Sequence, residues 1–260
     1  MTLLRSIALA FSMFSRLPVP GVPWKEENRR YLLCALPLVG AVIGLFVWLW
    51  FWLGEILNLG LPLKAAGITL LPVAVTGGIH LDGFGDTLDA LASGAAPERK
   101  REILKDPRSG IFAVIGVAAY LLLYFALCTE LFFHRRILLL LGLIHILSRV
   151  WCALAVISFP AGSGRGLLET VKEPAAKKGA RIFLPVLLGL CTAGALFLDW
   201  RAGAAVTAAA SLCALHVLAV SRRHFGGMSG DLAGYLLQVA ELAMLAALVL
   251  VLKVGAAPWK

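Results

Sequence analysis

Residues 77–110 read GGIHLDGFGDTLDALASGAAPERKREILKDPRSG, and long apolar runs flank this polar stretch on both sides. Within it, Asp82, Asp86 and Asp89 are spaced by four and three residues. At about 100° per residue, a helix places these carboxylates on one narrow face. Each crowded pair repels by ~4 kcal/mol at ~4 Å and intermediate dielectric. The pattern predicts a site for a hard cation, with a solvated acidic face as the alternative.

The flanking apolar runs indicate the fold class. The chain has 260 residues, 60% of them hydrophobic, and a mean hydropathy of +0.88. Soluble domains are nearer half apolar. Seven runs have about the length that a bilayer helix needs, namely Tyr31–Leu53, Leu63–Ile79, Ile111–Cys128, Ile137–Ile157, Ile182–Leu198, Ala202–Val220 and Tyr235–Leu252. We therefore expect an all-α polytopic membrane helix bundle with about seven transmembrane helices, forming a single domain over residues 1–260.

The first twenty residues, MTLLRSIALAFSMFSRLPVP, carry a shorter apolar segment. Its core runs from Ser6 to Phe14, and Arg16 and Pro18 follow it without a small-residue cleavage site. An interfacial or partly inserted helix fits this pattern better than a signal peptide. Arg16 then serves either as an interface anchor or as a substrate contact.

The basic residues predict the orientation in the membrane. Outside the predicted spans, 17 Lys and Arg residues lie on the same side of the membrane as the N-terminus, and 6 lie on the opposite side. The positive-inside rule places the richer side in the cytosol. The net charge of +9 therefore reflects cytosolic loops and anionic headgroups rather than nucleic acid. The five cysteines lie in or beside apolar runs and indicate neither a disulfide framework nor a zinc site.

Three motifs in chain order carry a resemblance to a known family. They are His80-Leu81-Asp82-Gly83 with Asp86 and Asp89, the run Lys105-Asp106-Pro107-Arg108-Ser109-Gly110, and the run Gly226-Gly227-Met228-Ser229-Gly230-Asp231 with Gly234. Together with residues 11–20, they resemble cobalamin synthases, the CobS family of adenosylcobinamide-GDP ribazoletransferases. The resemblance covers almost the whole chain. It implies that α-ribazole or its 5′-phosphate displaces GMP from adenosylcobinamide-GDP, which forms adenosylcobalamin or its phosphate.

The residues and the resemblance together predict a site. Oxygen-only ligands beside a phosphorylated substrate favour Mg²⁺ over zinc or calcium. We expect Mg²⁺ at Asp82, Asp86, Asp89 and Asp106, and catalytic roles for His80, Asp82 and Asp86. We expect the helix to begin near Asp82, after a break at Gly77-Gly78, so that His80 can act as a base or a phosphate ligand. A helix that extended back through His80 would point its side chain about 160° away from Asp82.

Further residues are expected to hold the substrate. Arg108 suits a bidentate phosphate contact, and a glycine-rich loop before a helix can cradle phosphate. The substrate-binding set is Lys105, Arg108, Gly110, Arg149, Arg165, Gly227, Ser229 and Asp231, with Arg16, Gln238 and Glu241 as further candidates. For the motif at 105–110, a positive-inside anchor with a helix cap is the alternative. Asp231 can equally cap its helix or bind metal, and Gln238 and Glu241 should face a cavity.

Arg149 lies inside a predicted span, about 12 Å from its cytosolic end. An arginine at that depth costs roughly 2.5–3.5 kcal/mol on insertion scales, so it needs an anionic partner or a polar cavity. The partner is either a substrate phosphate or a structural group such as Glu241.

Other functions compete with this interpretation. CDP-alcohol phosphotransferases use D-x-x-D-G-x-x-A-R, but no Ala-Arg follows Gly83 here, and aromatic prenyltransferases use two separated Asp motifs where this chain has one dense cluster. A cation-coupled transporter would need paired, interrupted helices. The resemblance implies an enzyme of the cell (inner) membrane whose active site faces the cytosol. Contacts with other late enzymes of cobalamin biosynthesis and a homo-oligomer are both compatible with it.

Overall fold

The structure, a computed structural model, describes residues 2–160 and 174–255. Within them every regular element is helical. The elements are α1 (Thr2–Phe14), α2 (Glu26–Arg29), α3 (Leu32–Ile56), α4 (Leu61–Thr76), α5 (Ile79–Ala92), α6 (Pro97–Ile103), α7 (Ile111–Thr129), α8 (Arg135–Ser158), α10 (Pro174–Leu198), α11 (Trp200–Val220), the π-helix η1 (Ser221–Phe225) and α12 (Gly230–Gly255). The all-α prediction is confirmed. Arg165 lies outside the described residues.

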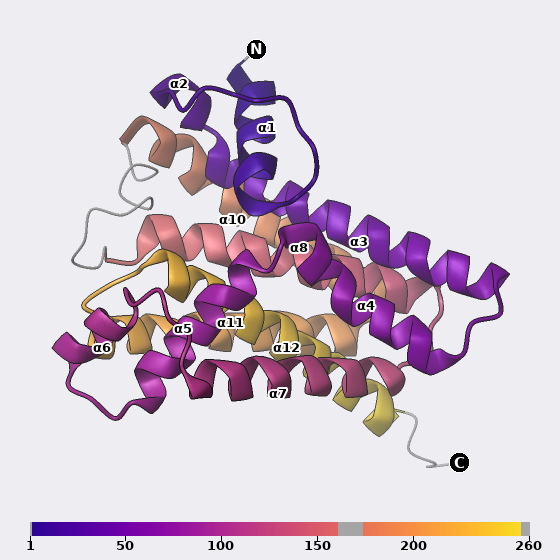
Figure 1. Cartoon of the computed structure of the whole chain (residues 1–260). Helices are drawn as coiled ribbons and strands as arrows, with labels where there is room; N and C mark the ends of the chain where they lie inside the picture. Colours follow the sequence, from indigo (N-terminus) through magenta and orange to yellow (C-terminus); the bar gives the residue numbers. More distant parts are fainter. Residues whose placement is uncertain (1, 161–173, 256–260) are drawn as a thin grey trace.

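Most of the long helices, among them α3, α7, α8 and α12, run back and forth between the two ends of the molecule and lie roughly left to right in Figure 1. Across the described part of the chain, six helices are long and apolar enough to cross a membrane. The pair α4 and α5 makes a seventh crossing if the two are counted as one broken span. Helix α1 is apolar but has only 13 residues, too few to span a bilayer. The protein is thus a multi-pass membrane protein with a short N-terminal helix, as predicted.

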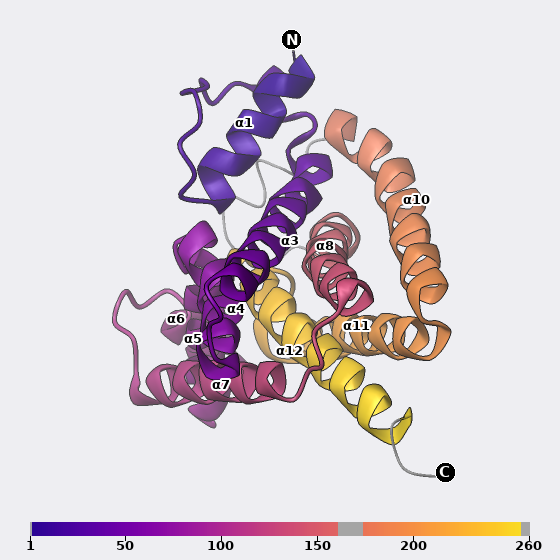
Figure 2. The same ribbon diagram turned by 90° about the vertical axis from the view of Figure 1, so that its right-hand side faces the viewer.

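The acidic stretch does not continue the second predicted span. That span was estimated to reach Ile79, but α4 ends at Thr76 and α5 begins at Ile79, and the two helices are bent by 94° relative to each other. Gly77 and Gly78 lie between them with φ angles of 65° and 78°. Two consecutive left-handed residues terminate a helix and suit glycine, which has no Cβ to clash. The bend carries α5 across the bundle, against α12 and α7 (Figures 1 and 2).

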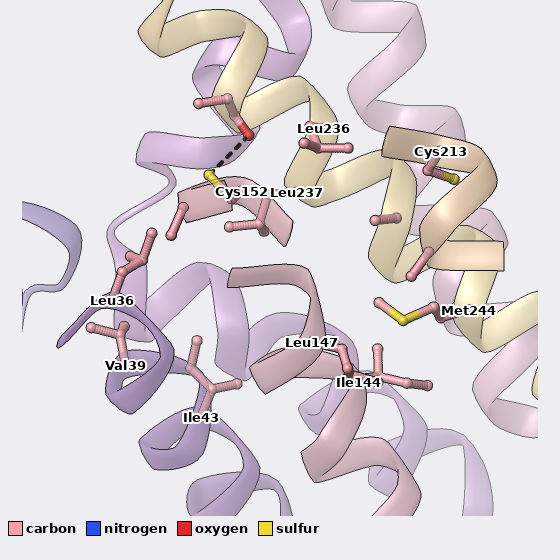
Figure 3. Packing of buried hydrophobic residues seen from close by; sticks show 14 of the residues in the cluster. Leu36, Val39, Ile43, Ile144, Leu147, Cys152, Cys213, Leu236, Leu237 and Met244 are labelled. Atoms are coloured by element: carbon pink, nitrogen blue, oxygen red, sulfur yellow. Dashed lines mark hydrogen bonds between the residues drawn. The ribbon is translucent and has the colours of Figure 1, made fainter. Parts of the chain in front are cut away.

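The core of the bundle lies between α3, α8 and α12. Figure 3 shows Leu36, Val39 and Ile43 of α3 facing Ile144 and Leu147 of α8. On the other side of α8, the Cys152 thiol donates a hydrogen bond to the carbonyl of Ala233 in α12, with 3.6 Å between the heavy atoms. This core fixes α12, on which the acidic helix α5 packs.

Small residues let α3 approach α8 closely. A Cβ built on Gly44 would lie 2.8 Å from the Cα of Gly142, and one on Gly40 would lie 2.3 Å from the carbonyl oxygen of His145. Without a strong hydrophobic driving force between helices in lipid, such close backbone packing is a main source of helix association.

The N-terminal helix is fastened to the bend. Leu9 and Ala10 of α1 are buried, and α1 packs against α3. Just after α1, the backbone N–H of Arg16 donates to the carbonyl of Val75 at 2.8 Å. Figure 2 shows α1 beside α3 at one end of the bundle. The hydrogen bond to Val75 brings Arg16 to the turn that starts the acidic helix.

Candidate active site

A cavity of about 630 Å³ opens at the bend between α4 and α5. Its walls come from the end of α1 and the two residues that follow it, the last residue of α4, the glycine turn, the start of α5 and one residue of α7. The lining residues are Ser12, Met13, Ser15, Arg16, Thr76, Gly77, Gly78, Ile79, Leu81, Asp82 and Val117. The Arg16 side chain lies over Gly77, where a Cβ would come 2.4 Å from its Nε. The cavity therefore brings an exposed arginine and the first carboxylate of the acidic motif to one space.

Two glycines bring the acidic motif and the late glycine motif into backbone contact. A Cβ built on Gly83 of α5 would lie 2.8 Å from the Cα of Asp231 in α12. A Cβ built on Gly234 of α12 would lie 2.8 Å from the carbonyl oxygen of His80 in α5. Both distances are shorter than real Cβ contacts allow, so each position requires glycine. Since Gly83 lies against Asp231 and His80 lies against Gly234, the two helices are antiparallel here.

This packing places a fourth carboxylate beside the acidic face. The negative charges of Asp82, Asp231 and Asp89 all act on the carboxylate of Asp86. Asp82 is exposed, whereas Asp86 and Asp231 are half-buried. Among the described residues, Asp82 and Asp86 have no side-chain hydrogen bond or ion pair. Their oxygens are therefore available to a ligand, although no three His, Cys, Asp or Glu side chains of the described chain converge into a ready metal site.

Asp89 has a different role from its two neighbours. Its two carboxylate oxygens accept the backbone N–H groups of Gly110, at 2.5 Å, and Ala113, at 3.0 Å. Gly110 precedes α7 and Ala113 lies in its first turn, so Asp89 caps the start of that helix. A Cβ on Gly110 would lie 2.6 Å from Asp89 Oδ2. The geometry thus favours a structural role for Asp89 and for Gly110, in place of the predicted metal and substrate contacts.

His80 lies away from the acidic face. The expectation that α5 begins near Asp82 was wrong, because the helix already begins at Ile79. His80 is therefore on the opposite side of the helix from Asp82. Its ring is buried and stacks on Phe14 of α1, with 6.0 Å between ring centroids. This position does not support His80 as the base beside Asp82.

The motif at 105–110 is exposed and internally paired. Asp106 accepts hydrogen bonds from the Arg108 guanidinium, with Nε to Oδ1 and Nη2 to Oδ2 both at 3.0 Å. These hydrogen bonds hold the pKa of Asp106 below its usual value. Lys105 is also exposed. Asp106 was expected as a metal ligand and Arg108 as a phosphate clamp. In the structure the two side chains form an ion pair with each other instead.

The late glycine loop uses most of its polar groups internally. The N–H of Gly227 donates to the carbonyl of Ser221 at 2.9 Å, and Ser229 Oγ accepts the N–H of Leu232 at 3.2 Å. Ser229 also interacts with the carboxylate of Asp231. This loop therefore fixes the first turn of α12 and the direction of Asp231, and phosphate contacts by Gly227 and Ser229 stay predictions.

Of the two partners considered for Arg149, the structure shows Glu241. Arg149 is 1% exposed and forms an ion pair with Glu241, which is equally buried. The same Glu241 oxygen accepts hydrogen bonds from Ser148 and His145, both at 3.0 Å. Gln238, one turn before Glu241, is also buried. Glu241 therefore faces a protein cation rather than the expected cavity, and Arg149 is not free to hold a substrate phosphate in this arrangement.

Comparison with known proteins identifies the family. The model of the family described as cobalamin-5-phosphate synthase matches residues 6–249. The chain belongs to this family. A relative from Lachnoclostridium phytofermentans, named adenosylcobinamide-GDP ribazoletransferase, is 39% identical over 239 residues, covering 92% of this chain and 91% of the relative. A relative of the same name from Ectopseudomonas mendocina is 38% identical over 246 residues, covering 93% and 97%.

Membership of the cobalamin-5-phosphate synthase family makes the protein a transferase of cobalamin biosynthesis. A relative from Clostridium perfringens strain SM101, also named adenosylcobinamide-GDP ribazoletransferase, is 32% identical and covers 91% of this chain and 94% of itself. No solved structure matches. Two of the three motifs that carried the resemblance, the acidic motif and the late glycine motif, are brought together at Gly83 and Asp231.

Sequence patterns missed part of the site. The cavity walls include Ser12, Ser15 and Thr76, which belong to none of the three motifs. Their contribution depends on how the end of α1 docks at the α4–α5 bend, which is a tertiary contact. The nearest signal was the run at residues 11–20, which pointed to Arg16.

Proposed function

We propose that the protein transfers the adenosylcobinamide-phosphate group of adenosylcobinamide-GDP to α-ribazole or its 5′-phosphate. An oxygen of the ribazole attacks the phosphorus that carries cobinamide, and a new P–O bond forms. The bond from that phosphorus to the bridging oxygen of the diphosphate breaks, and the electron pair stays on the departing GMP. The proton of the attacking hydroxyl passes to solvent or a nearby carboxylate. The products are adenosylcobalamin, or its 5′-phosphate, and GMP.

The meeting of the acidic and glycine motifs is the observation that carries this proposal. Phosphoryl transfer needs positioning and charge stabilisation more than a covalent nucleophile. Asp82 lines a cavity with Arg16, and Asp86 and Asp231 lie next to it. In this proposal Arg16 orients a phosphate or phosphate ester in the cavity. The carboxylates hold the opposite side of the diphosphate through a cation.

The residues fit Mg²⁺. This ion is usually held by one or two carboxylates together with substrate phosphates and water, so it needs no closed protein cage. Asp82 and Asp86 lie one turn apart, offer only oxygen and have no protein partner among the described residues. The charge of Asp82 also acts on Asp231, so Asp231 adds negative charge beside the two carboxylates and favours a cation there. Mg²⁺ bound there would neutralise the diphosphate and the departing GMP.

The proposed orientation places this site in the cytosol. The N-terminus and the loops that precede α3, α7 and α12 lie at one end of the molecule (Figure 1). The basic residues concentrate in these segments, and the positive-inside rule favours the cytosol for that end. Nucleotide substrates are found there, and in a bacterium the membrane would be the inner membrane.

One assay tests the function. Purified full-length protein in detergent should release GMP from adenosylcobinamide-GDP only when both α-ribazole and Mg²⁺ are present. Asp82→Asn measured in parallel provides the site-directed control. GMP release that does not require α-ribazole, or does not require Mg²⁺, would contradict the proposal. Repeating the assay with α-ribazole 5′-phosphate in place of α-ribazole would show which acceptor is preferred.

A further inference from the structure

A buried lysine lies beside the π-helix, outside the motifs that the site uses. Lys100 of α6 is 6% exposed, and its Nζ lies 3.5 Å from His224 Nδ1 in η1. Within the described part of the chain, Lys100 makes no ion pair with a carboxylate. Burying a cation without an anionic partner is costly. The position therefore calls for an anion that the described residues do not supply.

Further positive charge surrounds Lys100. The Nη1 of Arg101 lies 3.5 Å from the place of a Cβ on Gly226, while its Nη2 pairs with Glu98 at 2.9 Å. The charges of Lys100 and Arg223 both act on His224. We call Lys100, Arg101, Arg223 and His224 the π-helix cluster. Single π-helical turns occur frequently at functional sites.

The cluster lies at the end of the loop that leads to the proposed active site. Gly226, under Arg101, is five residues before Asp231, so the chain between them can reach at most ~18 Å. Gly226 and Gly227 have φ angles of 69° and 144°, which glycine adopts readily because it has no Cβ. Because α5 and α12 are antiparallel at Gly83, the loop continues past Asp86 toward α6. The carboxylates and the cations thus lie at opposite ends of one short segment.

We infer that the π-helix cluster binds the guanylate part of the substrate, the GMP that leaves. The inference rests on the proposed function. When the bond between the two phosphorus groups breaks, the bridging oxygen keeps the electron pair, and the GMP phosphate gains negative charge. Cations at Lys100, Arg101 and Arg223 stabilise that charge, and a protein lysine or arginine bonds a phosphate more strongly than a neutral donor does. A phospholipid headgroup shares this phosphate chemistry, so the test must separate the two.

Binding of GMP to the purified full-length protein tests the inference directly. Lys100→Met keeps the length of the buried side chain and removes its charge. Arg223→Gln changes an exposed residue, where substitutions usually alter stability little. Each should weaken GMP binding about tenfold, the effect of losing one charge-assisted hydrogen bond. The matched control is Arg99→Gln on the same helix, whose partner is Glu102 at 2.7 Å. It should bind GMP as the wild type does.

The outcomes separate this inference from the proposed function. Wild-type affinity for GMP in both Lys100→Met and Arg223→Gln overturns the inference, as does an equal loss in Arg99→Gln. A second outcome also overturns the inference: phosphatidylglycerol in the micelle displaces GMP from the wild type but has no such effect on Lys100→Met. That result would assign the cluster to a lipid headgroup. If GMP binds through the cluster but no GMP is released from adenosylcobinamide-GDP, the proposed reaction fails and the nucleotide site stands.

Discussion

The Cα of Gly83 lies against the backbone of Asp231, so closely that a Cβ at position 83 would come 2.8 Å from the Asp231 Cα. The first residue belongs to the acidic motif and the second to the late glycine motif, nearly 150 residues apart in the chain. This contact aligns Asp231 with Asp82 and Asp86. The arrangement of the carboxylates therefore depends on a residue without a side chain.

Gly83→Ala should separate α5 from α12 and lower turnover strongly. The added methyl meets backbone atoms, which cannot move aside as a flexible side chain would, and overpacking typically costs ~1–3 kcal/mol. Gly234→Ala should behave in the same way, since its Cβ would meet the His80 carbonyl. Gly189→Ala is the control because nothing lies within 4 Å of its Cβ. Activity and melting temperature would be measured together, and full activity in Gly83→Ala would show that the contact is dispensable.

The three carboxylates of the acidic motif should differ on mutation. Asp82→Asn and Asp86→Asn should each lower turnover roughly a hundredfold, about 2.7 kcal/mol of transition-state stabilisation, and leave the fold as stable or slightly more stable because repulsion falls. Asp89→Ala should instead lose about 1 kcal/mol of stability, because α7 loses its cap. Activity against Mg²⁺ concentration and melting temperature without Mg²⁺ separate these effects. Equal behaviour of all three variants would contradict the assignment.

The fold was predictable from the sequence because a helix that crosses a bilayer requires a run of about twenty apolar residues, and such runs are visible in the sequence. The break at Gly77-Gly78 was predictable too, since consecutive glycines end helices. The onset of α5 was not, and the error of three residues turned His80 away from Asp82. The role of Asp89 was also hidden, because its partners are backbone N–H groups 21 and 24 residues later in the chain. Contacts of that kind depend on helix packing and leave no local pattern.

Arg16 should contribute to substrate binding without stabilising the fold. Its exposed side chain lies over Gly77 and lines the cavity with Asp82. Arg16→Gln should lower kcat/KM about tenfold, the effect of losing a charged hydrogen bond to phosphate, while the melting temperature changes little. Arg5→Gln, which removes an exposed arginine from α1 away from the cavity, is the matched control. A role limited to membrane anchoring predicts the same kinetics for both variants.

The two termini should lie on opposite sides of the membrane, with the N-terminus in the cytosol. Six continuous spans and the bent pair of α4 and α5 make seven crossings, which agrees with the distribution of Lys and Arg. A reporter enzyme that works only in the periplasm should be active when it is fused at the C-terminus. A reporter that works only in the cytosol should be active when it is fused at the N-terminus. A cytosolic C-terminus would mean that α4 and α5 form a re-entrant segment rather than a crossing.

The buried pair of Arg149 and Glu241 should be essential for stability and not for substrate affinity. Arg149→Met or Glu241→Gln alone leaves an unpaired charge in the bundle, which typically costs ~3–5 kcal/mol. The double variant should lose less than the sum of the single losses, because no isolated charge remains. Glu130→Gln removes a partner from the exposed pair with Lys253 and should cost less than ~1 kcal/mol. Thermal unfolding in detergent gives the stabilities, and kinetics on the folded fraction give KM. If Arg149 held a substrate phosphate instead, the folded single variant would show a raised KM, and the double variant would not recover stability.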